Sequence, residues 1–131
     1  MPLPDTEKVS VNLGLVDLGQ IDLLVEQGFY SNRTDFIKTA VRNQLQPHTA
    51  TLQQQFEAQS LLLGISVFSR QALERFKSKG KMIKIRVVGI VVIGEDVTPQ
   101  LALDTIKVIK VLGALRASDE VRAALADRIE P

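Results

Sequence analysis

The 131-residue chain contains no cysteine and a single histidine, His48. Disulfide bonds, thiolate catalysis and cysteine metal sites are therefore excluded, as is a histidine-rich metal site. No apolar run approaches the ~18 residues that a membrane-spanning helix needs, and the start of the sequence lacks the basic flank and apolar core of a signal peptide. We therefore expect a cytoplasmic protein with no membrane segment, no metal and no other cofactor.

An excess of charge of one sign is also missing. The composition of 45% hydrophobic and 24% charged residues, with a formal net charge of +1, is that of a soluble globular protein. Residues 1–47 carry four basic and six acidic side chains, a net of −2, whereas residues 48–131 carry twelve and nine, a net of +3. Global charge therefore does not indicate nucleic-acid binding, and such a function must come from local pattern.

The first 47 residues have the pattern of one strand followed by two helices. Residues 7–13 alternate between apolar and polar side chains, which is the period of a half-buried strand. The apolar positions are Val9, Val11 and Leu13, and the polar positions are Lys8, Ser10 and Asn12. A helical pattern over residues 18–25 then stops at Gly28, which suits a left-handed C-terminal cap. Asn32 is expected to cap a second helix that ends near Pro47.

The predicted strand has no second strand nearby with which to pair. An isolated strand leaves its backbone groups and its apolar face unsatisfied, and a unit of about 40 residues is too small to bury an adequate core alone. The simplest partner is the same strand of a second chain, lying antiparallel across a two-fold axis. We therefore expect a homodimer, with pairing as a condition of folding.

These residues resemble the ribbon-helix-helix superfamily of the Arc, MetJ and CopG type. The resemblance covers the stretch K-V-S-V-N-L at 8–13 and the stretch G-F-Y-S-N-R-T-D-F-I at 28–37. It implies an intertwined dimer whose two-stranded ribbon enters the major groove of double-stranded DNA. It further implies that Lys8, Ser10 and Asn12 contact base edges, and that Ser31, Asn32 and Arg33 at the start of the second helix bind a phosphate.

The remaining sequence contains an internal repeat with an offset of 24 residues. Six positions recur identically: Ile85, Val87, Gly89, Val97, Leu101 and Ala102 return as Ile109, Val111, Gly113, Val121, Leu125 and Ala126. Each copy has the pattern of an apolar strand, an acidic turn and a short helix, and residues 61–78 resemble a degenerate earlier copy. We predict an α+β protein in which a ribbon-helix-helix domain at 1–47 and a linker or connecting helix at 48–60 precede a solenoid-like repeat domain with parallel strands at 61–131.

The predicted strand over residues 87–93 is apolar on both faces and has to be covered, so stacking between subunits into a higher oligomer is expected. No catalytic constellation emerges, because the acid pairs at 95–96 and 119–120 are explained by their places near helix starts. We therefore expect no enzyme but a DNA-binding transcriptional regulator, a repressor, whose repeats mediate oligomerisation. Two alternatives are an antitoxin, whose C-terminal part covers a toxin partner, and a self-assembling scaffold tethered to DNA.

Overall fold

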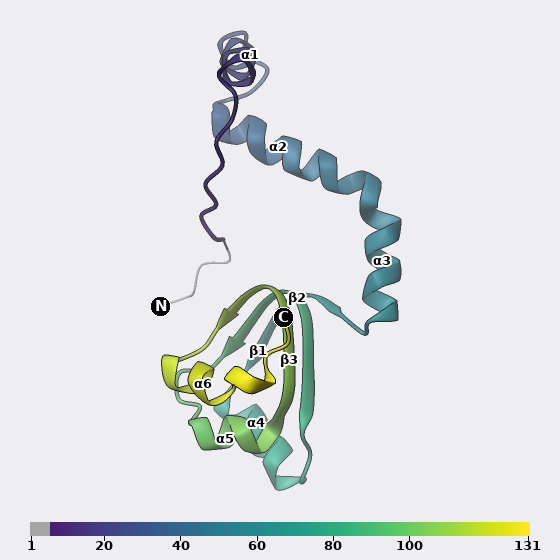
Figure 1. The fold of residues 1–131 in the computed structure, drawn as a ribbon, viewed down its shortest axis with the longest axis vertical. Helices are drawn as coiled ribbons and strands as arrows, with labels where there is room; N and C mark the ends of the chain where they lie inside the picture. Colours follow the sequence, from purple (N-terminus) through teal and green to yellow (C-terminus); the bar gives the residue numbers. More distant parts are fainter. Residues whose placement is uncertain (1–5) are drawn as a thin grey trace. The chain divides into compact units, whose positions relative to one another are not determined.

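A computed structural model describes residues 6–131 of the protein, and the chain divides into two compact units (Figure 1). The N-terminal unit is residues 1–54 and the C-terminal unit is residues 55–131. Their boundary falls within helix α3 (Thr49–Ala58), in the segment that the sequence suggests as a linker or connecting helix. The first five residues of the predicted ribbon-helix-helix domain lie outside the described residues.

The N-terminal unit consists of an extended segment and helices. Helix α1 is Leu15–Glu26, helix α2 is Arg33–Leu45, and the 3₁₀ turn η1 (Gln46–His48) leads from α2 into α3. Residues 6–14 form neither helix nor strand in the single chain. The predicted strand at 7–13 is therefore absent as a strand here, because a strand requires a hydrogen-bonded neighbour and no other segment within residues 6–54 supplies one. Its pairing with a second chain stays a prediction.

The connection between α1 and α2 is fixed by the residues that the sequence singled out. Gly28 has a φ of 87°, the amide of Gly28 donates to the carbonyl of Val25, and the amide of Phe29 donates to that of Leu24. This pair of bonds is the Schellman motif, which places glycine at the left-handed position. Asn32 caps α2, since its side-chain oxygen accepts a hydrogen bond of 2.8 Å from the amide of Asp35. Both predicted helix boundaries are confirmed.

The C-terminal unit alternates strand and helix. Its elements are β1 (Leu62–Phe68), α4 (Arg70–Ser78), β2 (Ile83–Ile93), α5 (Pro99–Thr105), β3 (Ile106–Arg116), α6 (Asp119–Ala124) and η2 (Ala126–Arg128). The strands form one parallel sheet in the order β1-β2-β3. The α+β class and the parallel strands are therefore confirmed. The sheet register pairs Ile85 with Ile109 and Gly89 with Gly113, which are equivalent positions of the predicted repeat, whereas the solenoid interpretation stays a prediction.

The core of this unit lies on one side of the sheet. Alternate residues of β2 are buried against the helices, and α4, α5 and α6 contribute Leu73, Leu101 and Val121 to the same cluster. Two consecutive parallel connections of the same hand bring their helices onto the same face, as Figure 1 shows for α4 and α5. The other face of the sheet contributes no residue to this cluster.

A row of three glycines crosses the sheet. Gly64, Gly89 and Gly113 are register partners, and their φ values are 132°, 136° and 130°. A Cβ atom added to Gly89 would lie 2.1 Å from the carbonyl oxygen of Gly64, and one added to Gly113 would lie 2.0 Å from that of Gly89. The close approach of each strand to the next therefore requires glycine at these two positions.

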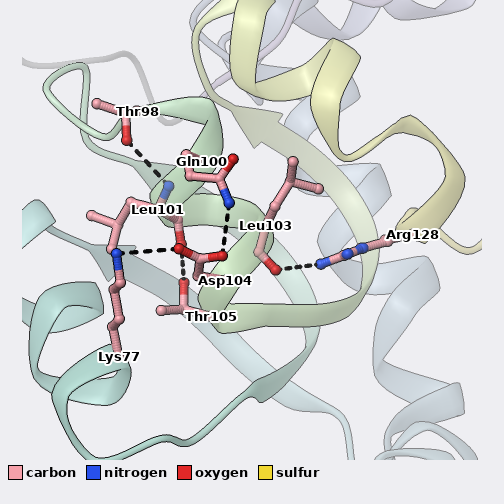
Figure 2. A network of polar contacts seen from close by, with 8 residues as sticks. All are labelled: Lys77, Thr98, Gln100, Leu101, Leu103, Asp104, Thr105 and Arg128. Atoms are coloured by element: carbon pink, nitrogen blue, oxygen red, sulfur yellow. Dashed lines mark hydrogen bonds and ion pairs between the residues drawn. The ribbon is translucent and has the colours of Figure 1, made fainter.

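Polar contacts hold the end of α5 (Figure 2). Arg128 donates from one nitrogen to the carbonyl oxygens of Leu103 and Ile106, at 2.6 and 2.7 Å. The hydroxyl of Thr105, which is fully buried, donates to the carbonyl of Leu101 at 2.7 Å. Because the last carbonyls of a helix lack partners within it, Arg128 supplies the donors that α5 needs where it passes directly into β3.

Candidate nucleic-acid interface

An apolar groove of ≈ 750 Å³ runs between the extended N-terminal segment and the two following helices. Its apolar lining comes from all three parts: Val9, Val11, Leu13, Ile21, Leu24, Phe36, Ile37, Ala40 and Val41. Most of these side chains are open to solvent, and Val9 and Val11 are 78% and 71% exposed. Within residues 6–54, Ile21 is the one apolar side chain that is buried. The single N-terminal unit therefore lacks a core of its own.

The polar side chains of the extended segment are turned elsewhere. Lys8, Ser10 and Asn12 are exposed and do not line the groove, whereas the alternate positions 9, 11 and 13 do. The alternation read from the sequence thus separates an apolar edge, directed at the helices, from a polar edge that is open to solvent. Lysine, serine and asparagine on such an edge can donate and accept hydrogen bonds at base edges.

The start of α2 holds the three residues predicted to bind phosphate. Ser31, Asn32 and Arg33 are all exposed. The amide of Ser31 donates to a carboxylate oxygen of Asp35 at 2.9 Å, so this amide already has a partner. The amides of Asn32 and Arg33 have no partner among the described residues. Two of the three predicted backbone donors are therefore free for an anion at the helix N-terminus.

The side chain of Arg33 is also engaged. Its Nε and Nη2 donate to the two carboxylate oxygens of Asp22 on α1, both at 2.8 Å, and both side chains are about half exposed. The hydrogen bond from Arg33, together with its charge, lowers the pKa of Asp22, and the pKa of Arg33 is raised in turn. This pair holds the guanidinium at the start of α2, so phosphate binding by Arg33 requires its free Nη1 or exchange of partner.

Sequence reasoning missed both acidic partners of the predicted phosphate site. Asp22 was hidden because it lies eleven positions before Arg33, on the other helix. Asp35 was recognised as a member of a capping pattern, but its carboxylate reaches the amide of Ser31, one residue before the cap. The pattern S-N-R-T-D contained this signal, since an acid three residues after a cap commonly bonds back to amides that precede the helix.

The C-terminal unit carries a cluster of basic side chains in and after α4. Arg70 pairs with Glu74 and Lys77 pairs with Asp104, at 2.9 and 3.2 Å. Arg75, Lys79, Lys81 and Lys84 are exposed and have no ion-pair partner among the described residues. Within residues 6–131 there is no group of three or more side chains suited to hold a metal ion, and no helix long and apolar enough to cross a membrane.

One half of a ribbon-helix-helix module consists of an extended segment with alternating side chains and a pair of helices. The N-terminal unit has these elements, together with a capped second helix and an apolar groove that is open to solvent. The sequence profile of the Ribbon-Helix-Helix transcriptional regulator family matches residues 4–122, and the chain belongs to this family. Searches of curated proteins and of solved structures found no match.

The family match extends far beyond the N-terminal third in which the sequence resemblance was recognised. It runs through β1, β2 and β3 and into α6. The C-terminal unit, which sequence reasoning assigned to no family, therefore lies largely within the family match. Its apolar strands, each interrupted by a glycine, gave no motif comparable to the one at residues 28–37.

Proposed function

We propose that this chain is a sequence-specific DNA-binding regulator, a repressor, that reads the major groove with a ribbon made from the N-terminal segments of two subunits. The apolar groove carries this proposal, because Val9, Val11 and Leu13 face it while the polar side chains between them do not. A second copy of the segment, paired antiparallel, satisfies the free backbone groups and brings two grooves together into a shared core. The ribbon then presents Lys8, Ser10 and Asn12 to DNA.

The residues of the ribbon and of α2 have different tasks in this proposal. Lys8 donates to guanine acceptors, Asn12 makes a bidentate contact to adenine, and Ser10 donates or accepts. The free amides of Asn32 and Arg33 hold a backbone phosphate with the help of the helix dipole. The net charge of −2 over residues 1–47 keeps nonspecific affinity low.

The C-terminal unit supplies oligomerisation in this proposal. Occupation of adjacent half-sites by linked dimers raises the effective concentration of each for its site, which compensates for a weakly charged DNA-binding module. The exposed lysines of the C-terminal unit add to the attraction for the DNA backbone without reading sequence. Such a regulator acts on DNA in the cytoplasm and breaks no covalent bond.

The experiment selects bound DNA from a random pool with the full chain, and then compares variants on the selected site. Asn12→Ala should weaken binding to that site by about 1–3 kcal/mol while leaving binding to unrelated DNA unchanged, because a base contact is lost and no phosphate contact is.

Asn43→Ala is the matched control, since Asn43 is an exposed asparagine in α2 that lies away from both the ribbon and the start of the helix. It should leave both affinities unchanged. An equal loss for Asn12→Ala on every sequence removes Asn12 from base reading, and failure to enrich any sequence contradicts specific binding.

A further inference from the structure

One face of the sheet of the C-terminal unit contributes no side chain to the core cluster of that unit. Side chains alternate along each strand, and register partners in a parallel sheet point to the same side. Since Val87, Val91 and Ile93 of β2 are buried against the helices, the residues between them point away. Across the three strands these form three rows: Leu63, Val88 and Leu112; Ile65, Ile90 and Ala114; Val67, Val92 and Arg116.

The eight apolar side chains of these rows make up the outer sheet patch. None belongs to the core cluster or to the apolar side chains packed against it. Leu63, Ile65 and Val67 are 72%, 60% and 64% exposed. Parallel sheets in proteins are generally covered on both faces, because their strands are apolar on both sides. By this rule the outer sheet patch is a candidate surface for a contact with another sheet.

Charged side chains border the patch only at its two ends. Arg116 lies in the last row, and Arg86 and Lys110 form the row before the first. Arg86 donates to the carbonyl of Gln59 at 2.8 Å and pairs with Glu130, and Lys110 donates to the side chain of Gln59 at 3.3 Å. The charges at the Arg86 and Lys110 end therefore have partners, whereas the Nε of Arg116 is buried and has no hydrogen-bond partner among the described residues. Two such patches can meet without burying this unpaired charge further when Arg116 stays at the rim of the contact.

The size of the patch sets how strongly it binds. Three strands about 4.8 Å apart and five residues of about 3.3 Å rise give a footprint of roughly 250 Å². Two patches pressed together bury roughly 500–1,000 Å² in all, whereas a stable interface between free proteins buries about 1,200 Å² or more. The patch is therefore too small to hold two free chains together, and it suits copies that another contact already keeps close.

We propose that the outer sheet patch packs face to face against the same patch of a second copy of this chain. The inference rests on the proposed function, since pairing through the N-terminal segments supplies the nearby copy. Sheets that stack in this way lie about 10 Å apart and interdigitate their side chains. The contact covers Leu63, Ile65 and Val67 of β1 and joins C-terminal units.

The sequence contains no cysteine, so a single introduced cysteine is the only thiol that can react. Its rate of labelling then measures how accessible that position is to solvent. Leu63→Cys and Ile65→Cys place the thiol in the patch. Leu62→Cys is the matched control, since Leu62 is the neighbour of Leu63, is 67% exposed, and points to the helix-covered side. The purified full chain is labelled with a maleimide over a range of concentrations, and the mass of each sample is measured in parallel.

Where the chain is a dimer or larger by mass, the thiols at 63 and 65 should react about tenfold more slowly than the thiol at 62. The rates should converge as dilution produces monomers. Equal rates in the assembled protein overturn the proposal while leaving N-terminal pairing intact. Protection that persists in the monomer also overturns it, since the chain then covers the patch itself. A chain that stays monomeric at every concentration contradicts N-terminal pairing and this proposal together.

Discussion

The glycine row across the sheet provides the sharpest test of how the C-terminal unit is built. Gly64 and Gly89 have nearly the same φ, 132° and 136°, so alanine at either position incurs a similar backbone strain. They differ in their surroundings: a Cβ on Gly64 meets nothing within 4 Å, whereas a Cβ on Gly89 lies 2.1 Å from the carbonyl oxygen of Gly64. A comparison of Gly64→Ala with Gly89→Ala therefore distinguishes the cost of backbone strain from the cost of the steric clash between β1 and β2.

The expected magnitudes follow from these contacts. Strain alone in Gly64→Ala costs about 1–3 kcal/mol. In Gly89→Ala the added methyl carbon also forces β1 and β2 apart by about 1 Å, which weakens several ladder hydrogen bonds of ~0.5–1.5 kcal/mol each. The total for Gly89→Ala is about 3–6 kcal/mol, a large part of the ~5–15 kcal/mol that stabilises a typical domain. Gly64→Ala should leave the unit folded, and Gly89→Ala should bring it close to unfolding.

Amide hydrogen exchange of the full chain measures this difference, because protection of the β2 amides reports on the C-terminal unit alone. Protection should fall by about one to two powers of ten in Gly64→Ala and by at least two in Gly89→Ala. Equal losses in the two variants would mean that the strands do not approach as closely as described. No loss in Gly89→Ala would refute the positive φ as well.

Three further changes test the ion pair on the N-terminal unit and the cap of α5. Asp22→Asn releases Arg33 and removes a negative charge, so binding to unrelated DNA should strengthen and the slope of its salt dependence should steepen by about one, as anisotropy titrations at several salt concentrations would show. Arg33→Gln should raise the pKa of Asp22 toward its ordinary value, which an NMR titration would measure. In the wild type the pKa of Asp22 is lowered, so the ion pair stabilises the folded state above about pH 4. This stabilisation is lost as the pH falls through the pKa of Asp22 in the folded state. An unchanged pKa would mean that the pair does not form in solution. Arg128→Met leaves the carbonyls of Leu103 in α5 and of Ile106 at the start of β3 without this donor and should cost about 1–3 kcal/mol in urea unfolding. Arg75→Met is the control: its exposed side chain has no ion-pair partner among the described residues, and the change should cost less than about 0.5 kcal/mol.

Much of the N-terminal unit could be predicted from the sequence because its signals are local. A glycine at a left-handed position and an asparagine before a helix act through their own backbone neighbourhood, so Gly28 and Asn32 could be assigned without tertiary information. The strand at 7–13 is different in kind. Its alternation is local, but the hydrogen bonds of a strand need a partner segment, and none of the described residues supplies one, so the segment has no strand pairing in the single chain.

The strands and helices of the C-terminal unit could be predicted from the sequence, but the exposed and buried faces of its sheet could not. The repeat offset anticipated which residues become register partners, as Gly89 and Gly113 show. Which face of each strand the helices cover could not be read from sequence, since Val87 and Val88 are equally apolar and one is buried while the other points away. That choice depends on the hand of the connections in three dimensions. Asp22, the acidic partner of Arg33, also could not be predicted from the sequence, because it lies on another helix and the contact depends on how the two helices pack.

Both units leave apolar surface that one chain does not cover, and this property links assembly to DNA binding. In the N-terminal unit the buried core within residues 6–54 is reduced to Ile21. In the proposed function, the DNA-reading ribbon and the folded unit therefore form in the same step as the dimer. The proposal then predicts that the stability of this unit increases with protein concentration, and that a dilute chain loses specific DNA binding through unfolding of the ribbon rather than through loss of any base contact. The proposed contact between C-terminal units would shift this balance toward the assembled form, and the sheet would then contribute to operator affinity without touching DNA.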